Sequence, residues 1–286
     1  MHKQLTLLLA LALATPAIAG DSPYTNSLES VLTLRVDGDI EIDATGHVTS
    51  HKLHSELPAD MQALIDKAIA RWKFLPPTAD GKPLERARSK MRIALVATEV
   101  EQDGGTGLIV KIENVTFPPP PADPAGKPAP AQPTIDAGRL PKLQVAAEAL
   151  ITFNVQYDAK GQVLNVAPSQ CTVLALGRGT NATSACETLE RDSVRAMRSW
   201  RVDNVKPDMA QPETGTVAIA FMWNRSAYKR RDSATGQWRR ELRSPYRVAP
   251  WEKPDALRVG TSDVDGSGLV TRASSLTLLE GIGKTL

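Results

Sequence analysis

The sequence predicts an α+β fold built from two small modules, each an antiparallel sheet with one helix packed on one face. Two stretches share the same order of features: a strand, an Asp-x-x-Gly turn, a returning strand and a helix that ends near a tryptophan. The turns span residues 43–46 and 158–161, and the tryptophans are Trp72 and Trp200. A unit of this size that recurs in one order indicates tandem small domains rather than one large core.

The length and composition leave room for two domains and their connections. The chain has 286 residues, of which 42% are hydrophobic, which is enough for packed cores. Residues between the copies are rich in proline, which favours an extended, semi-rigid spacer. We expect a signal peptide at 1–19, a first module at 27–117, a proline-rich linker at 118–141, a second module at 142–247 and a partly disordered tail at 248–286.

The amino terminus predicts export. Lys3 precedes an apolar run over residues 5–14, and small residues near Ala19 suit cleavage by signal peptidase. The run is shorter than the roughly 20 residues that a spanning helix needs, although an uncleaved anchor is the alternative. We therefore expect a periplasmic or secreted protein with no transmembrane segment in the mature chain. The net charge of +2 gives no global field that would recruit nucleic acid.

In the first copy, apolar residues alternate with polar ones from Val31 to Ile42, which predicts a half-buried strand. Residues 48–53 would return as a second strand. Pro58 suits the first turn of a helix, and apolar residues then recur at helical spacing up to Trp72. Residues 91–100 and 108–117 would form a further hairpin.

In the second copy, residues 149–157 and 163–166 would form the hairpin, and a capping box at Ser184 and Glu187 would start the helix. We expect residues 217–223 to be the last strand and to pair with residues 237–243. Cys171 and Cys186 are the two cysteines of the chain. In an oxidising compartment they should form a disulfide, and a redox-active pair is the alternative.

Taken together, these motifs resemble the carboxyl-terminal domain of TonB-family energy transducers, in two divergent copies. The first copy carries the Asp-x-x-Gly turn, a helix that closes in Trp72-Lys-Phe74, and the turn Asp80-Gly-Lys-Pro83. The second copy keeps the first two features and lacks the Gly-Lys-Pro turn. The chain also departs from the family in having its spacer between the copies rather than after a membrane anchor.

The resemblance implies a periplasmic protein-interaction module that binds an extended partner segment by adding it to a sheet edge. The partner would be a protein of the cell envelope, such as an outer-membrane receptor or its associated complex. Two copies would allow bivalent binding. The edge strands would be residues 91–97 and 217–223, and the binding residues Met91, Ile93, Leu95, Val217, Ile219 and Phe221.

Three other patterns suggest chemistry. Basic residues are interleaved with aromatic ones between 225 and 247, so an envelope-surface binder with a basic hairpin is one alternative function. His47, His51 and His54 lie close together but lack further ligands at metal-binding spacing, so we expect no metal or cofactor. No catalytic motif occurs, so we expect no enzyme, with a redox or hydrolytic enzyme as the other alternative. The basic patch comprises Lys229, Arg230, Arg231, Arg239, Arg240 and Arg243.

Overall fold

The structure is a computed structural model, and some parts of the chain fall outside what it describes. The expected signal peptide and most of the expected linker belong to those parts. The structure describes residues 28–79, 82–102, 105–117, 133–138, 145–205, 209–222, 235–253, 258–264, 268–271, 276–280, 282 and 285–286.

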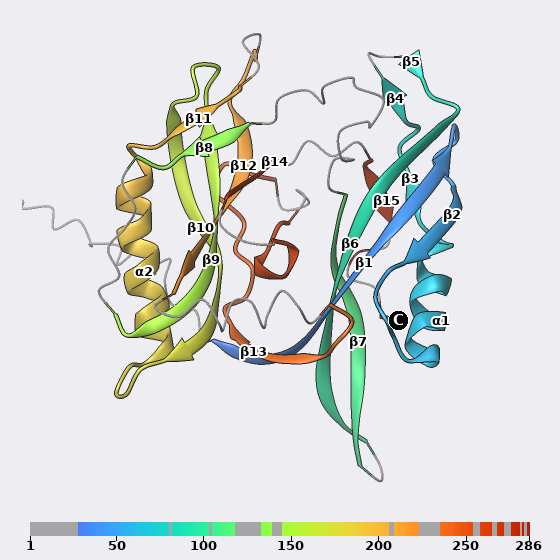
Figure 1. The fold of residues 1–286 in the computed structure, drawn as a ribbon, viewed down its shortest axis with the longest axis horizontal. Coiled ribbons are helices and arrows are strands. Elements are labelled where there is room, and N and C mark those ends of the chain that lie inside the picture. The colour runs from blue at the N-terminus through green and yellow to red at the C-terminus, as the bar shows by residue number, and fades with distance from the viewer. Residues whose placement is uncertain are drawn as a thin grey trace, which may run out of the picture.

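One nine-stranded antiparallel sheet runs through the molecule (Figure 1), in the order β14-β12-β9-β10-β13-β1-β6-β7, with β2 also paired to β1. The predicted fold class, two separate α+β modules, is therefore wrong. The sheet strands are β1 (Glu29–Asp43), β2 (Val48–Leu53), β6 (Arg86–Gln102), β7 (Gly105–Thr116), β9 (Ala147–Tyr157), β10 (Val163–Leu176), β12 (Glu213–Phe221), β13 (Arg239–Arg243) and β14 (Gly268–Thr271).

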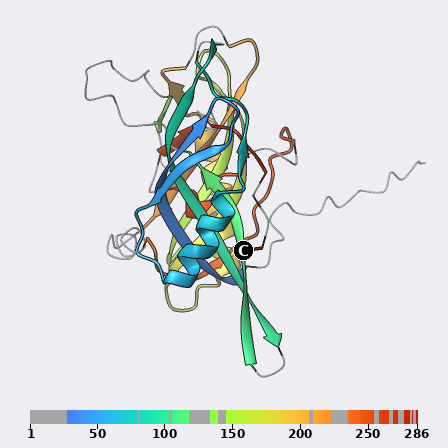
Figure 2. The same ribbon diagram turned by 90° about the vertical axis from the view of Figure 1, so that its right-hand side faces the viewer.

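Two helices, α1 (Ala59–Ile69) and α2 (Ala182–Met197), lie at opposite sides of the molecule, each outside one half of the sheet (Figure 1). Under each helix is a separate apolar cluster. Trp72 and Trp200 belong to these clusters, so both tryptophans pack in the cores. Viewed from the side (Figure 2), the β6–β7 hairpin extends beyond the rest of the molecule.

The sequence repeat appears as the same local hydrogen bonds in both copies. Gly46 and Gly161 have positive φ values of 83° and 73°. The carbonyl of each glycine accepts a hydrogen bond from the strand that follows the helix, from Phe74 N–H at 2.9 Å and from Val202 N–H at 2.8 Å. These residues lie in the short strands β3 (Lys73–Phe74) and β11 (Arg201–Asp203). Each copy thus closes its helix connection against its own turn.

Strand β13 joins the two copies into one sheet. It pairs with β1 at Glu29–Thr33 and with β10 at Thr172 and Val173. The predicted hairpin between residues 217–223 and 237–243 is therefore wrong, because β12 lies between β9 and β14. The physical reason is strand length: β2 covers β1 only at Gly38–Ile42, which leaves the start of β1 for another strand.

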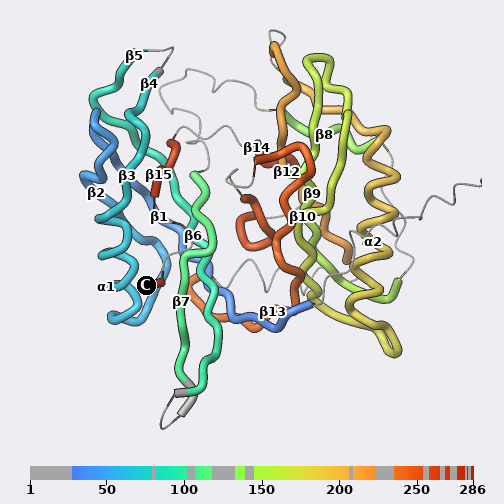
Figure 3. The backbone as a smooth tube through the Cα atoms, turned by 180° about the vertical axis from the view of Figure 1, so that it is seen from behind, coloured from blue at the N-terminus to red at the C-terminus, as the bar shows by residue number. Residues whose placement is uncertain are grey.

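The tail expected to be partly disordered contributes ordered segments to both copies (Figure 3). Its 3-10 turn η1 (Thr261–Asp263) contacts strands of both halves of the sheet. Strand β14 pairs with β12, and β15 (Leu278–Glu280) pairs with β3. Leu276 is buried in the first cluster. In the expected linker, β8 (Thr134–Asp136) pairs with β11. In the first copy, the short strand β4 (Thr78–Ala79) pairs with β5 (Lys82–Pro83).

Candidate functional site: a charged pocket beside strand β2

The strands predicted to be open edges are inside the sheet. β6 pairs with β1 on one side and with β7 on the other, and β12 pairs with β9 and, at Gly215–Ala218, with β14. Their apolar side chains face the cores, so the predicted partner-binding edge is corrected to core packing. At most 6% of the surface is exposed for each of Met91, Ile93, Leu95, Val217, Ile219 and Phe221.

A different strand offers an edge. β2 pairs with β1 at Gly38–Ile42, and in the described part of the chain no strand pairs with the other side of Val48–Leu53. β3 approaches only the start of this edge, through a bridge between Lys73 and His47. At the two ends of the sheet, β14 has only four residues, and β7 already carries a bridge between Lys111 and Thr285. β2 has no proline, so every residue keeps a backbone N–H for a ladder. It is therefore the best placed strand for adding a further one.

A pocket of about 510 Å³ lies beside this edge. The strand register places its polar residues in two cross-strand rows, Lys52–Asp39–Lys90 and Ser50–Glu41–Arg88. Because side chains alternate along a strand, Asp39 and Glu41 point away from the core that holds Ile40 and Ile42. The lining residues are Asp39, Ile40, Glu41, Ser50, His51, Lys52, Arg88, Ser89 and Lys90.

A ladder of opposite charges underlies the pocket. Acidic residues alternate along β1 and basic residues along β6, in the register Asp37–Arg92, Asp39–Lys90, Glu41–Arg88 and Asp43–Arg86. This ladder is not among the features predicted from the sequence, although the alternating charges of Asp-Gly-Asp-Ile-Glu-Ile-Asp and Arg-Ala-Arg-Ser-Lys-Met-Arg are visible there.

Within the described residues, the ladder neutralises the charge of Glu41 but leaves Lys52 and Lys90 without an ion pair. The guanidinium groups of Arg86 and Arg88 contact the two carboxylate oxygens of Glu41 at 3.2 and 2.5 Å. Lys52 and Lys90 are exposed, and neither forms an ion pair with any residue that the structure describes. The pocket therefore presents two ammonium groups that can bind an anionic ligand.

The three histidines do not converge on one point. His51 Nε2 lies 2.8 Å from Asp66 Oδ1 on α1, and His54 Nε2 lies 2.8 Å from Asp39 Oδ2 at the pocket. His47 Nδ1 is 2.8 Å from Thr45 Oγ1. Among the described residues, no three His, Cys, Asp or Glu side chains are grouped to hold a metal ion.

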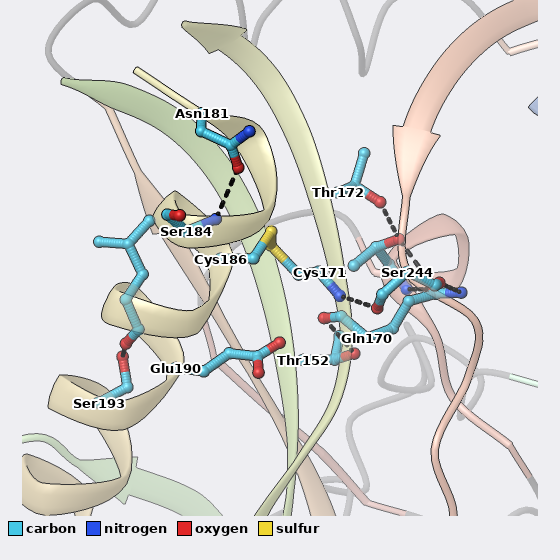
Figure 4. The surroundings of a disulfide bond; sticks show 12 residues. Thr152, Gln170, Cys171, Thr172, Asn181, Ser184, Cys186, Glu190, Ser193 and Ser244 are labelled. Carbon is cyan, nitrogen blue, oxygen red and sulfur yellow. Dashed lines mark hydrogen bonds between the residues drawn. A yellow bond between two sulfur atoms is a disulfide. The ribbon is translucent and has the colours of Figure 1, made fainter. Parts of the chain in front are cut away.

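The predicted disulfide is confirmed. Cys171 on β10 and Cys186 on α2 have their sulfur atoms 1.95 Å apart (Figure 4). The predicted capping box at Ser184 is wrong, because the helix begins earlier. Asn181 is the N-cap, and its Oδ1 accepts a hydrogen bond from Ser184 N–H at 3.0 Å. This bond takes up both cysteines of the chain.

Half of the predicted basic patch lies in the part of the chain that the structure describes. Lys229, Arg230 and Arg231 lie outside the described residues. Arg239, Arg240 and Arg243 lie on β13, between β10 and β1. Arg240 pairs with Glu99 at 2.6 Å, and Arg243, with a side chain 5% exposed, pairs with Glu113 at 2.6 Å. The guanidinium groups of Arg240 and Arg243 thus form ion pairs with acidic residues of the same sheet.

A buried carboxylate fixes the tail between the two halves of the sheet. Asp263 Oδ2 accepts hydrogen bonds from Asn114 Nδ2 at 2.9 Å and from Gly260 N–H at 2.8 Å. Arg92 Nη1 donates to the carbonyl of Asp263 at 3.1 Å. Burial raises the pKa of Asp263 from 3.8 to about 6. This residue therefore has a structural role in docking the tail.

None of the helices in the described part of the chain has the length and apolar character needed to cross a membrane. Comparisons of the chain with protein-family models, with curated proteins and with solved structures found no match.

Proposed function

We propose that this chain is an exported, non-catalytic binding protein that takes up an extended segment of a protein partner by β-addition to β2. The observation that carries the proposal is the outer edge of β2 at Val48–Leu53, which no strand among the described residues pairs with and which borders the charged pocket. Main-chain hydrogen bonds to such an edge supply affinity, and pockets for alternate side chains supply selectivity.

The molecule itself contains several strand additions of this kind. β13 pairs with the outer side of β10, which is the returning strand of the second copy as β2 is of the first. The tail adds β14 to β12 and β15 to β3. The resemblance to TonB carboxyl-terminal domains supports the same mode of binding. The proposed partner is accordingly a cell-envelope protein, such as an outer-membrane receptor or its associated complex.

The disulfide supports an oxidising, extracytoplasmic location, because such bonds persist mainly outside the cytosol.

The proposal places one binding site in the first copy. In the second copy, β13 covers β10 farther along the strand, at Thr172 and Val173.

The experiment is photocrosslinking in intact cells. A photoreactive residue at Ser50, an exposed position on β2, should capture a protein neighbour. The matched control is Gln62, an exposed position on α1 of the same copy. Capture from position 50 but not from position 62 is the expected result. Equal yields at both positions, or no protein captured at position 50, would contradict the proposal.

A further inference from the structure

We propose that the segment bound at β2 carries carboxylates on alternate residues and that Lys52 and Lys90 bind them in the pocket. This inference rests on the proposed β-addition and adds the chemical class of the partner.

The first step is the charge of the pocket. Its lining includes three cationic side chains, Lys52, Arg88 and Lys90, and two carboxylates, Asp39 and Glu41. Arg86 adds a further positive charge through its contact with Glu41. Glu41 is thus held by two guanidinium groups, and the surplus charge is positive. An anionic ligand gains from this surplus, whereas a cationic one would displace existing ion pairs.

The second step is the position of the lysines. Both are cross-strand neighbours of Asp39, one on each side. Neighbouring strands lie about 4.8 Å apart, so the backbones of Lys52 and Lys90 are separated by about 10 Å. The register places Asp39 between them, so a carboxylate of the added strand meets the pocket on its Lys52 side, and the long Lys90 side chain reaches toward it across Asp39. The two lysines therefore form the walls of one binding site.

The third step is the register of an added strand. Ser50 and Lys52 line the pocket face of β2, while His51 contacts Asp66 of α1 on the other face. A strand added beside β2 places every second side chain on the pocket face, about 5 Å from its neighbour on β2. Acidic residues at those alternate positions would extend over Lys52 toward Lys90. The partner predicted by this geometry is an extended acidic segment.

The test uses the full chain and three synthetic peptides with the same β-forming residue. These are acetyl-(Thr-Glu)4-amide, its Gln counterpart and its Lys counterpart, measured by isothermal titration calorimetry at low and moderate salt. We expect the Glu peptide to bind about fivefold more tightly than the Gln peptide and the Lys peptide to bind most weakly. The preference for Glu should shrink as salt rises, since exposed ion pairs are screened.

Matched variants assign the effect to the two lysines. Lys52→Glu and Lys90→Glu should each remove the preference for the Glu peptide, and the milder Lys90→Gln should reduce it. Lys160→Glu is the control, because Lys160 is an exposed lysine in the turn of the second copy. A preference that survives Lys52→Glu and Lys90→Glu together, or one that Lys160→Glu abolishes equally, would overturn the inference.

Two further measurements separate this inference from the proposed function. Peptides N-methylated on alternate backbone nitrogens lose the main-chain ladder. Equal binding of the unmethylated Glu and Gln peptides, with loss on methylation, would overturn the acidic partner but leave β-addition standing. Binding that methylation does not weaken would overturn β-addition itself. Competition by free glutarate at the affinity of the Glu peptide would overturn the assignment to an extended segment.

Discussion

Two glycines show how a single residue position can hold a supersecondary unit together. A Cβ atom built on Gly46 would lie 2.1 Å from the carbonyl oxygen of Phe74, and one on Gly161 would lie 2.0 Å from that of Val202. Both positions also have positive φ, which side chains rarely adopt. The strand after each helix can pack this closely only against a residue without a side chain.

We expect Gly161→Ala to lower the free energy of unfolding by about 3 kcal/mol, because it combines backbone strain with a clash against Val202. Gly179→Ala is the control, since Gly179 has the same φ of 73° but nothing within 4 Å of a built Cβ. That variant should lose about 1 kcal/mol from strain alone. Urea unfolding of both variants measures the difference. Equal losses would show that the contact with Val202 has no energetic role.

Asp263 predicts a pH dependence of stability. Its pKa is raised from 3.8 to about 6 in the folded chain, chiefly by burial. Its contribution to stability is therefore complete below about pH 4 and is lost as the pH rises through 6. Relative to Asp263→Asn, the wild-type chain should lose up to about 3 kcal/mol between pH 4 and pH 7. Urea unfolding at four pH values would check this, and parallel profiles for the two proteins would contradict it.

At the scale of elements, the two copies differ in how their helices are attached. The second helix has 16 residues against 11 in the first, and it has both an Asn181 N-cap and a disulfide to the returning strand. The first helix has no side-chain cap, because Pro58 precedes it. Its attachment depends on apolar residues such as Ile65 and Ile69.

The disulfide should contribute measurably to stability. Replacing Cys171 and Cys186 together by serine removes a covalent link across 15 residues. For a loop of this length we expect a loss of about 3 kcal/mol in the free energy of unfolding, mainly through the greater entropy of the unfolded chain. Thermal and urea unfolding of the double variant, beside the wild-type chain with and without reductant, would measure it. A double variant as stable as the oxidised wild type would contradict this account.

At the scale of the whole molecule, the two copies share one sheet and exchange segments. β13 lies at the end of the second copy and pairs with the first strand of the first copy. The tail then contributes β14 to one half and Leu276 and β15 to the other. Each copy thus has a core of its own, but its strand neighbours come from distant parts of the chain.

This arrangement predicts that both halves unfold together. Variants that keep only Trp72 or only Trp200, with the other tryptophans replaced by phenylalanine, would report on the two clusters separately by fluorescence. We expect coincident denaturant transitions, because losing β13 and the tail would leave both halves with open edges. Two transitions at clearly different midpoints would show that the halves are independent domains.

The sequence predicts the local elements well and their assembly poorly. Alternation around Val36 and Ile40 identifies β1, and helical spacing identifies both helices, because these patterns reflect one buried face. β13 has the sequence Arg-Arg-Glu-Leu-Arg and no comparable alternation, and its place depends on the part of β1 that β2 leaves unpaired. The same limit applies to the candidate site. The charges of β1 and β6 are visible in the sequence, but the pocket exists only once the register brings Asp39 between Lys52 and Lys90.

The insertion of β13 beside β1 also determines when the protein can fold. Ser30 and Arg240, which meet across these two strands, are 210 residues apart. At about 5–20 residues per second, a ribosome needs roughly 10–40 s to make the intervening chain. During that time the nascent amino-terminal half has an unfilled strand position that can pair with other chains. Chaperone capture, or passage through a translocation channel before folding, would protect this half until synthesis is complete.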